Sequence, residues 1–251
     1  DTKRVLFVPP VKASQTTFVE SDSIQELYDG TMINMFFHNN EWILTTRSDV
    51  GLKNKWGKKS FKTLFEECGG NNLYNNKLNK NYTYSFVMQH VENRNVTEIL
   101  MNRLILVEVR HNLELVDLET IPKNENYMIA NYLTKENLDY YNNILSNNSL
   151  GTFGWKGFTI KQNDKRFNVI NPMFENVNKL KTNSTNPLYT FCELFKSSKL
   201  QEFIHYFPDN TKLFEKYKML TNICIKELYD NYVDIKIKKC KLLHETPSIT
   251  K

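Results

Sequence analysis

The order of apolar and polar positions over the first two thirds of the chain predicts antiparallel strands joined by short turns. Residues 32–37 and 42–47 are rich in aromatic and β-branched side chains, and the polar stretch 38–41 separates them. This arrangement predicts a β-hairpin. Two further hairpins are predicted in the same way: residues 104–110 with 113–118 around His111-Asn112, and residues 157–161 with 167–170 around Gln162-Asn163-Asp164.

Other strands and one helix are predicted before and between these hairpins. Residues 5–8 predict a short strand that Pro9-Pro10 ends, because proline donates no hydrogen bond to a sheet. Residues 82–89 predict a longer strand. Residues 134–145 predict a helix, which residues 147–154 follow as a loop.

A short helix is predicted to begin after Ser60, whose hydroxyl can cap the first turn. Gly69 is predicted to end this helix, and residues 71–81 are predicted to form a polar loop. One apolar face of the helix consists of Phe61, Leu64, Phe65 and Cys68.

The pattern changes near residue 186, where apolar residues begin to recur every three or four positions. This spacing predicts helices, the first beginning at Asn186-Pro187 and the second ending before Pro208. A third and longer helix is predicted to begin near residues 209–211. Its apolar stripe consists of Leu213, Tyr217, Leu220, Cys224 and Leu228, and that of the second helix of Leu200, Phe203 and Ile204. We therefore predict two domains, residues 1–183 and an all-helical domain at 184–251.

Composition and charge leave the class of partner open. The chain has 251 residues, 40% of them apolar, and a net charge of +5, which permits contact with nucleic acid without requiring it. No apolar run approaches the roughly 20 residues that span a bilayer, and no signal peptide is visible. The start at Asp1 suggests a processed or excised segment. We expect a cytoplasmic or virion-associated protein that is not secreted.

Neither the cysteines nor the histidines show the spacing of a metal site. Cys68, Cys192, Cys224 and Cys240 lie far apart and form no paired motif, so free thiols are expected. The histidines show no nearby acid dyad and are expected to be solvated or structural; they are His38, His90, His111, His205 and His244.

Four segments, in this order, resemble the sequence pattern of phage-type RNA ligases, which are covalent nucleotidyltransferases. They are Leu27-Tyr28-Asp29-Gly30-Thr31, Thr45-Thr46-Arg47-Ser48-Asp49-Val50-Gly51, residues 84–96 with Asn93-Arg94-Asn95-Val96, and residues 155–160 with 167–172. Residues 186–232 are similar to the helical tail of ligase-like proteins of large DNA viruses. The resemblance implies an α+β fold: a mostly antiparallel β nucleotidyltransferase (ligase-like) core with peripheral helices, followed by a small all-helical C-terminal region.

The same resemblance implies a degenerate active site. Active members of the class attack the α-phosphate of ATP or GTP with a lysine two residues before Asp-Gly, and this position is Leu27 here. The class also uses two glutamates, here Val87 and Lys156, and two lysines. At the two lysine positions this chain has Asn168 and Ile170. The residues of the pattern that it keeps include Asp29, Gly30 and Arg47. The resemblance therefore implies no catalytic residue and no metal ligand.

These positions also have structural interpretations. Leu27 and Val87 would be ordinary core residues of strands, and Lys156 a surface charge. Arg47 could bind phosphate or pair with a carboxylate. A basic and aromatic cluster could follow a nucleic-acid backbone or form a solvated loop; it consists of Lys55, Trp56, Lys58, Lys59 and Lys62.

The sequence thus leads to one hypothesis with two alternatives. The hypothesis is a catalytically degenerate ligase-like module that binds protein partners in a larger assembly and needs no cofactor. Contact with RNA or DNA is possible under the same hypothesis. The first alternative is an active ATP-dependent RNA ligase or guanylyltransferase with an unrecognised nucleophile, which would use ATP and Mg²⁺. The second is a protein that binds single-stranded nucleic acid.

Overall fold

The computed structural model describes residues 5–15, 23–55, 57–75, 78–134, 139, 152–162, 165–182, 184, 186–240 and 242. The chain divides into two compact units, Asp1–Lys179 and Leu180–Lys251. The boundary predicted from the sequence, after residue 183, lies a few residues further along the chain.

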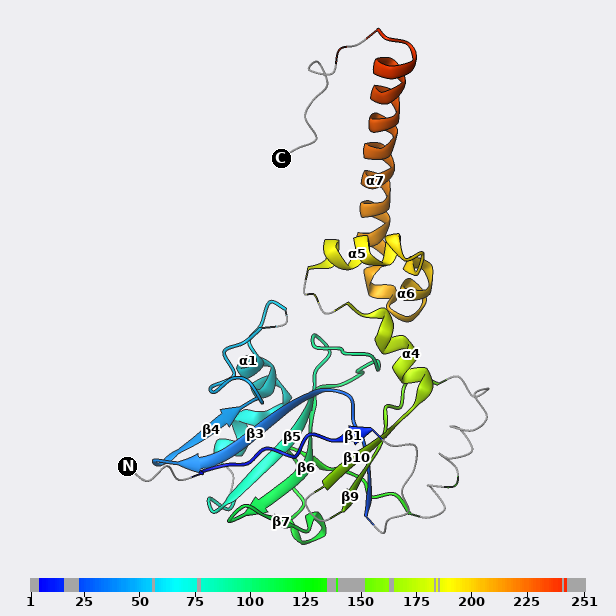
Figure 1. Cartoon of the computed structure of the whole chain (residues 1–251). Helices are drawn as coiled ribbons and strands as arrows, with labels where there is room; N and C mark the ends of the chain where they lie inside the picture. Colours follow the sequence, from blue (N-terminus) through cyan, green and yellow to red (C-terminus); the bar gives the residue numbers. More distant parts are fainter. Residues whose placement is uncertain are drawn as a thin grey trace. The chain divides into compact units, whose positions relative to one another are not determined.

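The described part of the first unit contains two β-sheets and is α+β, with mostly antiparallel strands (Figure 1). The smaller sheet has the order β1-β10-β9-β2 and contains β1 (Ser14–Gln15), β2 (Ile24–Glu26), β9 (Gly157–Gln162) and β10 (Lys165–Ile170). The larger sheet has the order β4-β3-β5-β6-β7, with β8 beside β6, and contains β3 (Thr31–His38), β4 (Glu41–Thr45), β5 (Tyr82–Gln89), β6 (Arg103–His111), β7 (Glu114–Val116) and β8 (Met128–Ile129). Only the pairs β1–β10 and β6–β8 are parallel among these described strands.

The three predicted hairpins are confirmed as β3–β4, β6–β7 and β9–β10. Asn39 and Asn40 join the first pair with φ angles of 49° and 64°, and Asn112 has a φ of 49° in the second turn. Two positive φ angles in succession give a turn whose twist matches that of the flanking strands, and asparagine tolerates this conformation. The tip of the third hairpin, residues 163–164, lies outside the described residues.

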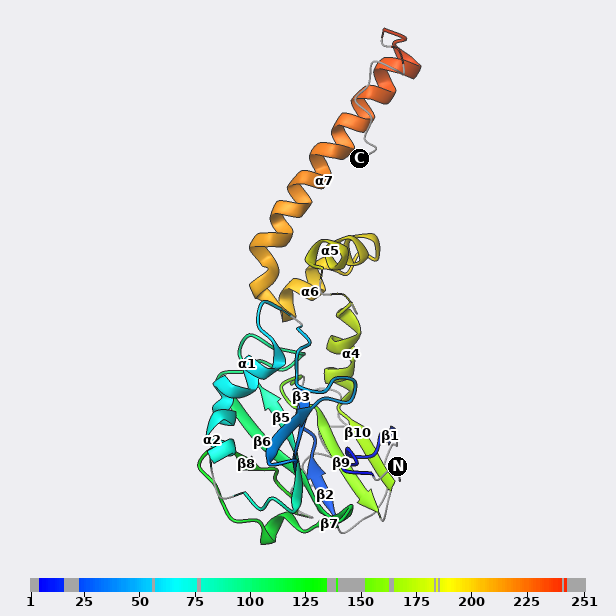
Figure 2. The same ribbon diagram turned by 90° about the vertical axis from the view of Figure 1, so that its left-hand side faces the viewer.

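The core of this unit lies on the face of the larger sheet that α1 and α2 cover (Figure 2). Ser60 caps α1 (Phe61–Phe65), as predicted, by accepting a hydrogen bond from the Thr63 amide. The chain turns at Gly69, which has a φ of 96°, within Glu66–Gly70 and then continues as α2 (Asn71–Asn75). The predicted polar loop is therefore wrong for residues 71–75. The residues that pack in this layer include Ile33, Met35, Phe86, Met88, Leu104 and Leu106 from the strands and Phe61, Leu64, Phe65 and Leu73 from the helices.

Some predicted elements differ from the structure. The strand predicted at residues 5–8 is wrong, since the first described strand is β1. The helix α4 (Pro172–Leu180) was not predicted, although proline stands at its first position and the Asn171 side chain accepts a hydrogen bond from the Met173 amide. The helix predicted at residues 134–145 falls almost entirely outside the described residues.

The N-terminal segment, residues 7–15, contacts both sheets (Figure 1). The Phe7 ring stacks on the Phe36 ring of β3 at 5.4 Å between centroids. Further along, the guanidinium of Arg47 donates to the Pro10 carbonyl oxygen at 3.4 Å, and β1 then pairs with β10. The segment therefore links the larger sheet to the edge of the smaller one.

The second unit is helical where it is described, as predicted. It contains α5 (Pro187–Lys196), α6 (Leu200–Tyr206) and α7 (Thr211–Tyr232), which continues into Val233–Ile237. Asn186 caps α5 by accepting a hydrogen bond from the Leu188 amide. The three helices meet at an aromatic cluster of Phe191, Phe203, Phe207, Phe214 and Tyr217. No described helix of the chain is long and apolar enough to cross a membrane.

Gly30 should be irreplaceable for packing, because its φ is +154° and an added Cβ would lie 2.5 Å from the Met88 carbonyl oxygen. We expect Gly30→Ala to lower the free energy of unfolding by about 2 kcal/mol or more, measured by urea denaturation. Gly57→Ala is the matched control, since a Cβ there meets no described heavy atom within 4 Å. Equal stability of the two variants would contradict this packing.

Candidate functional site

A pocket of about 300 Å³ brings together three of the residues singled out in the sequence, Leu27, Asp29 and Lys156. Leu27 and Asp29 lie in the connection between β2 and β3, whereas Lys156 lies directly before β9. The other residues that line the pocket are Glu26, Tyr28, Gln89, Thr97, Glu98, Ile99, Leu100, Met101, Arg103, Gly154 and Trp155. The pocket is therefore formed where the two sheets are joined by chain segments far apart in the sequence.

The carboxylate of Asp29 is buried and accepts hydrogen bonds from the opposite wall of the pocket. Its Oδ2 atom accepts from the backbone amides of Val96 at 2.8 Å and Thr97 at 3.1 Å. The side chains of Asn95 and Thr97 donate to the same carboxylate at 3.4 Å. A carboxylate that accepts this many bonds is held in one orientation and fixes the loop that donates them.

Lys156 completes the surroundings of Asp29. Its Nζ atom lies 3.5 Å from Asp29 Oδ1, and it also lies 5.6 Å from the centre of the Phe174 ring on α4. The side chain is 26% exposed, so the ion pair is partly shielded from water. The interpretation of Lys156 as an ordinary surface charge is therefore wrong, because its charge is paired inside the pocket.

Leu27 presents an aliphatic side chain to the same pocket. Its backbone amide donates to the Gly157 carbonyl oxygen at 2.9 Å, which fixes the residue against the start of β9. The side chain is half-buried and carries no lone pair, so it cannot act as a nucleophile or a proton acceptor.

The remaining singled-out positions lie outside the lining of this pocket. Val87 is buried beneath Gly30, in a cluster that includes Tyr28 and Met32. On β10, Asn168 lies opposite Thr159 and Ile170 lies opposite Gly157. Asn168 Oδ1 is buried and has no hydrogen-bond partner among the described residues.

Arg47 lies beyond the end of β4 rather than on the strand, and its described hydrogen bond is to the Pro10 carbonyl oxygen. This hydrogen bond attaches the N-terminal segment to the residues after β4. The two alternatives drawn from the sequence, a bound phosphate and a carboxylate partner, stay predictions.

Several residues of the pocket were not singled out as site residues in the sequence. The Tyr28 hydroxyl donates to Glu26 Oε2 at 2.6 Å, and burial, together with Glu26, raises the pKa of this phenol. Arg103 donates to the Gln89 side chain at 2.7 Å, and Gln89 in turn donates to the Asp29 carbonyl oxygen at 2.7 Å. These contacts join strands β5 and β6 to the pocket, and no local sequence motif predicts them.

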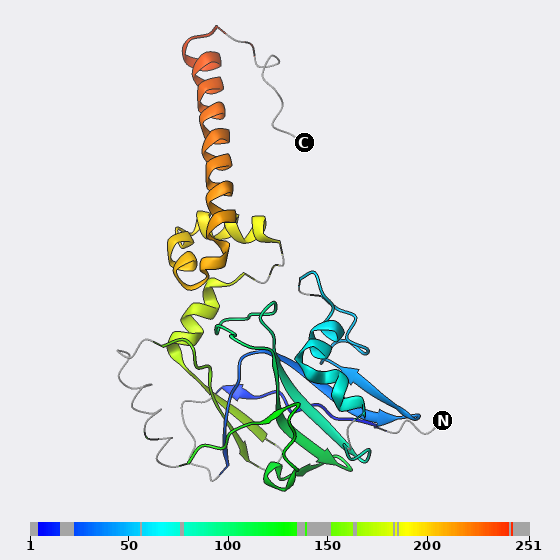
Figure 3. The same cartoon turned by 180° about the vertical axis from the view of Figure 1, so that it is seen from behind.

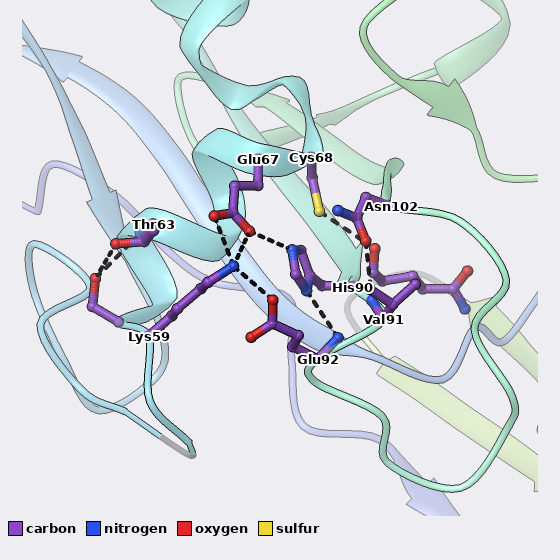
Figure 4. A network of polar contacts seen from close by, with 10 residues as sticks. Lys59, Thr63, Glu67, Cys68, His90, Val91, Glu92 and Asn102 are labelled. Carbon is purple, nitrogen blue, oxygen red and sulfur yellow. Dashed lines mark hydrogen bonds and ion pairs between the residues drawn. The ribbon is translucent and has the colours of Figure 1, made fainter.

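The basic cluster of the sequence is partly neutralised (Figure 4). Lys59 Nζ lies 2.9 Å from Glu67 and 2.6 Å from Glu92. These two ion pairs hold the segment Glu66–Gly70 against the loop after β5. Lys62 lies 4.0 Å from Glu66. Lys55 and Lys58 are exposed, and Trp56 lies outside the described residues. Lys59 therefore has a structural partner, whereas for the exposed Lys55 and Lys58 both interpretations, a solvated loop and a nucleic-acid contact, stay predictions.

His90 lies in the same network and pairs with one acid, Glu67, in keeping with the expected structural role (Figure 4). Its Nδ1 atom accepts from the Glu92 amide at 3.0 Å, which leaves Nε2 to donate to Glu67 Oε2 at 2.8 Å. Cys68 beside it donates to the Gln89 carbonyl oxygen, and burial raises the pKa of its thiol to about 12. Both side chains are therefore structural rather than reactive.

A buried group of charges joins the two sheets beside the N-terminal segment. Glu108 of β6 lies 2.8 Å from Arg110 Nε and 3.8 Å from Lys161 Nζ of β9. Lys161 also donates to the Val107 carbonyl oxygen at 2.9 Å. Burial lowers the pKa of Lys161 to about 8, although Glu108 opposes this shift.

The described residues contain no group of three or more metal-ligating side chains.

No protein-family model and no curated protein matches the chain. A solved structure described as an ATP-dependent DNA ligase from Aquifex aeolicus is similar, with a TM-score of 0.40 and 13% sequence identity over 85% of this chain. The chain spans 61% of the length of that protein.

The buried amine of Lys161 predicts a specific pH dependence of stability. The pKa is lower in the folded protein, about 8, than the 10.5 of a free lysine, so burial of the charge opposes folding below pH 8. As the pH rises from about 8 to about 10, the folded protein loses this proton first and gains stability. Urea denaturation should show this gain in the wild type relative to Lys161→Met.

Lys165→Met serves as the control, because Lys165 is an exposed neighbour on the next strand. This variant should follow the pH dependence of the wild type. A constant difference between wild type and Lys161→Met from pH 7 to pH 10 would contradict the burial of the charge.

Proposed function

We propose that this chain is a non-catalytic member of the ligase-like nucleotidyltransferases and acts as a binding or structural module in a larger assembly. The observation that carries the proposal is that Leu27, Asp29 and Lys156 share one pocket. In the pattern that the sequence resembles, these positions hold a nucleophilic lysine, the aspartate of Asp-Gly and a glutamate.

The residues of the pocket do not fit covalent nucleotidyl transfer. That reaction needs an amine with a free lone pair to attack the α-phosphate and cationic groups to stabilise the transferred charge. Leu27 has no lone pair, and the amine of Lys156 is held by Asp29. Asn168 and Ile170 supply no positive charge at the positions of the two lysines.

The residues of the ligase pattern that this chain keeps make structural contacts. These contacts support a protein that has kept the fold of the family without its catalytic residues. Asp29 fixes the loop at residues 95–97, and Asn93 donates to the Thr31 hydroxyl at 2.8 Å. Asn171 donates to the carbonyl oxygens of Thr152 and Trp155, at 2.9 and 2.8 Å. A fold can keep such contacts while the function of its site changes.

The partner we propose is another protein, in a viral particle or in the cytoplasm. The similarity of residues 186–232 to the helical tail of viral ligase-like proteins supports a viral setting. The exposed apolar side chains of α7 support protein rather than nucleic acid as the partner. The second alternative, binding of single-stranded nucleic acid through the basic cluster, has less support, because Lys59 and Lys62 are already paired.

One observation favours an active enzyme as a second candidate. Lys156 brings an amine into the pocket that Leu27 lines, so it could serve as a displaced nucleophile. The ion pair with Asp29 argues against this, because a protonated amine has no lone pair to donate.

The two candidates differ in whether a covalent adduct forms. We expect no acid-stable label on the protein after incubation with α-labelled ATP or GTP and Mg²⁺ or Mn²⁺, read on a denaturing gel. Leu27→Lys is expected to remain unlabelled too, because the other replaced positions still lack their charges. An authentic ligase in the same mixture is the positive control, and circular dichroism checks that each variant is folded.

A labelled band on the wild-type protein would overturn the proposal. Loss of that band in Lys156→Ala, but not in Lys161→Ala, would then assign the nucleophile to Lys156 and establish the second candidate.

A further inference from the structure

The helix α7 exposes apolar side chains over most of its length. Of its 22 residues only Phe214 is buried, and the described parts of α5 and α6 lie against the first turns of the helix (Figures 2 and 3). From residue 218 onward, apolar side chains are between 45% and 64% exposed; they include Met219, Leu220, Ile223, Ile225, Leu228, Tyr229 and Tyr232. The stripe predicted from the sequence is therefore not part of the described core beyond Tyr217.

Helices with this much apolar surface are normally covered in an assembly. Leu220, Cys224 and Leu228 follow one another at intervals of four residues, so they lie along one side of α7. Tyr217 and Leu213 extend the same side toward the aromatic cluster. We call this side, from Leu213 to Leu228, the α7 stripe.

Charges beside the α7 stripe differ between its two halves. Lys216 flanks it in the first half, and Asp230 flanks it in the second. Lys216 and Asp230 are 14 residues apart, which is nearly four full turns, so both lie on the same flank to within roughly 40°. Asp234 continues this flank beyond α7, where it already pairs with Lys238 at 3.1 Å.

We propose that the α7 stripe pairs with the α7 stripe of a second copy of this chain, with the two helices antiparallel. In an antiparallel pair each flank faces the same flank of the partner, so Lys216 of each copy lies opposite Asp230 of the other. This register is centred on Ile223. Cys224 then lies close to its counterpart at the two-fold axis.

The charges select this arrangement over the parallel one. A parallel pair would bring the two basic halves together and the two acidic ends together, which is repulsive. A second copy is also self-complementary by symmetry, because one surface supplies both the basic and the acidic half. The proposal does not depend on whether the pocket of the first unit is catalytic.

The 251-residue chain should form a dimer whose population rises with concentration in sedimentation-velocity experiments. Lys216→Asp should weaken the dimer about 10-fold or more, since it replaces two attractive pairs by two repulsive ones. The double variant Lys216→Asp with Asp230→Lys should restore the affinity. Glu215→Lys is the control, because the exposed Glu215 is two residues from both Leu213 and Tyr217 and so lies on the side of the helix opposite the α7 stripe, and it should leave the dimer unchanged.

Cross-linking provides a second readout of the same register. In a variant with Cys192→Ser and Cys240→Ser, a short bis-maleimide, which adds one thiol at each end, should join Cys224 to Cys224 of the partner subunit and yield a covalent dimer. Lys216→Asp should reduce that yield.

Three results would overturn the proposal. A chain that remains monomeric at millimolar concentration has no such interface. A dimer that Lys216→Asp does not weaken, although Cys224 cross-links in it, is parallel, because there the change only exchanges one like-charge contact for another. A dimer that neither charge variant alters, and in which Cys224 does not cross-link, uses another surface.

Discussion

The buried carboxylate of Asp29 is the interaction on which the candidate site depends. It accepts hydrogen bonds from the amides of Val96 and Thr97 and pairs with Lys156, so one side chain joins three segments that are distant in sequence. An unpaired buried carboxylate costs several kcal/mol, which makes these donors a condition for folding rather than an optional addition. The loop after β5, the connection between β2 and β3, and the start of β9 are thereby fixed together.

The function proposed above gives these contacts one explanation: they are what a ligase-like frame would keep without its chemistry. Asp29 and Gly30 are required by packing and hydrogen bonding whether or not a nucleotide is ever bound. Leu27 gives the pocket an aliphatic wall, and Lys156 and Asp29 form an ion pair within it. These two features are the basis of the proposal that the pocket serves binding or structural support.

The sequence predicted what local patterns determine and missed what tertiary contacts determine. The hairpins β3–β4 and β6–β7 were predictable because apolar alternation and asparagine-containing turns act over a few residues. The pairing of Lys59 with Glu92, the burial of Lys161 and the closure of the pocket by Arg103 were not, because each joins residues with no fixed spacing in the chain. The helix α4 is different: Asn171-Pro172 is a recognisable start signal, but it was interpreted only as the end of a motif. For α7, periodicity predicted the helix correctly, whereas the amount of apolar surface it leaves exposed depends on what packs against it.

The most direct test of this account is the coupling between Asp29 and Lys156, measured by a double-mutant cycle. The free energy of unfolding is determined for the wild type, Asp29→Asn, Lys156→Met and the double variant. The account predicts that the two single losses are not additive, with a coupling energy of about 1 kcal/mol. A coupling within about 0.3 kcal/mol of zero would show that Lys156 is not held by Asp29 and would return a free amine to the pocket beside Leu27.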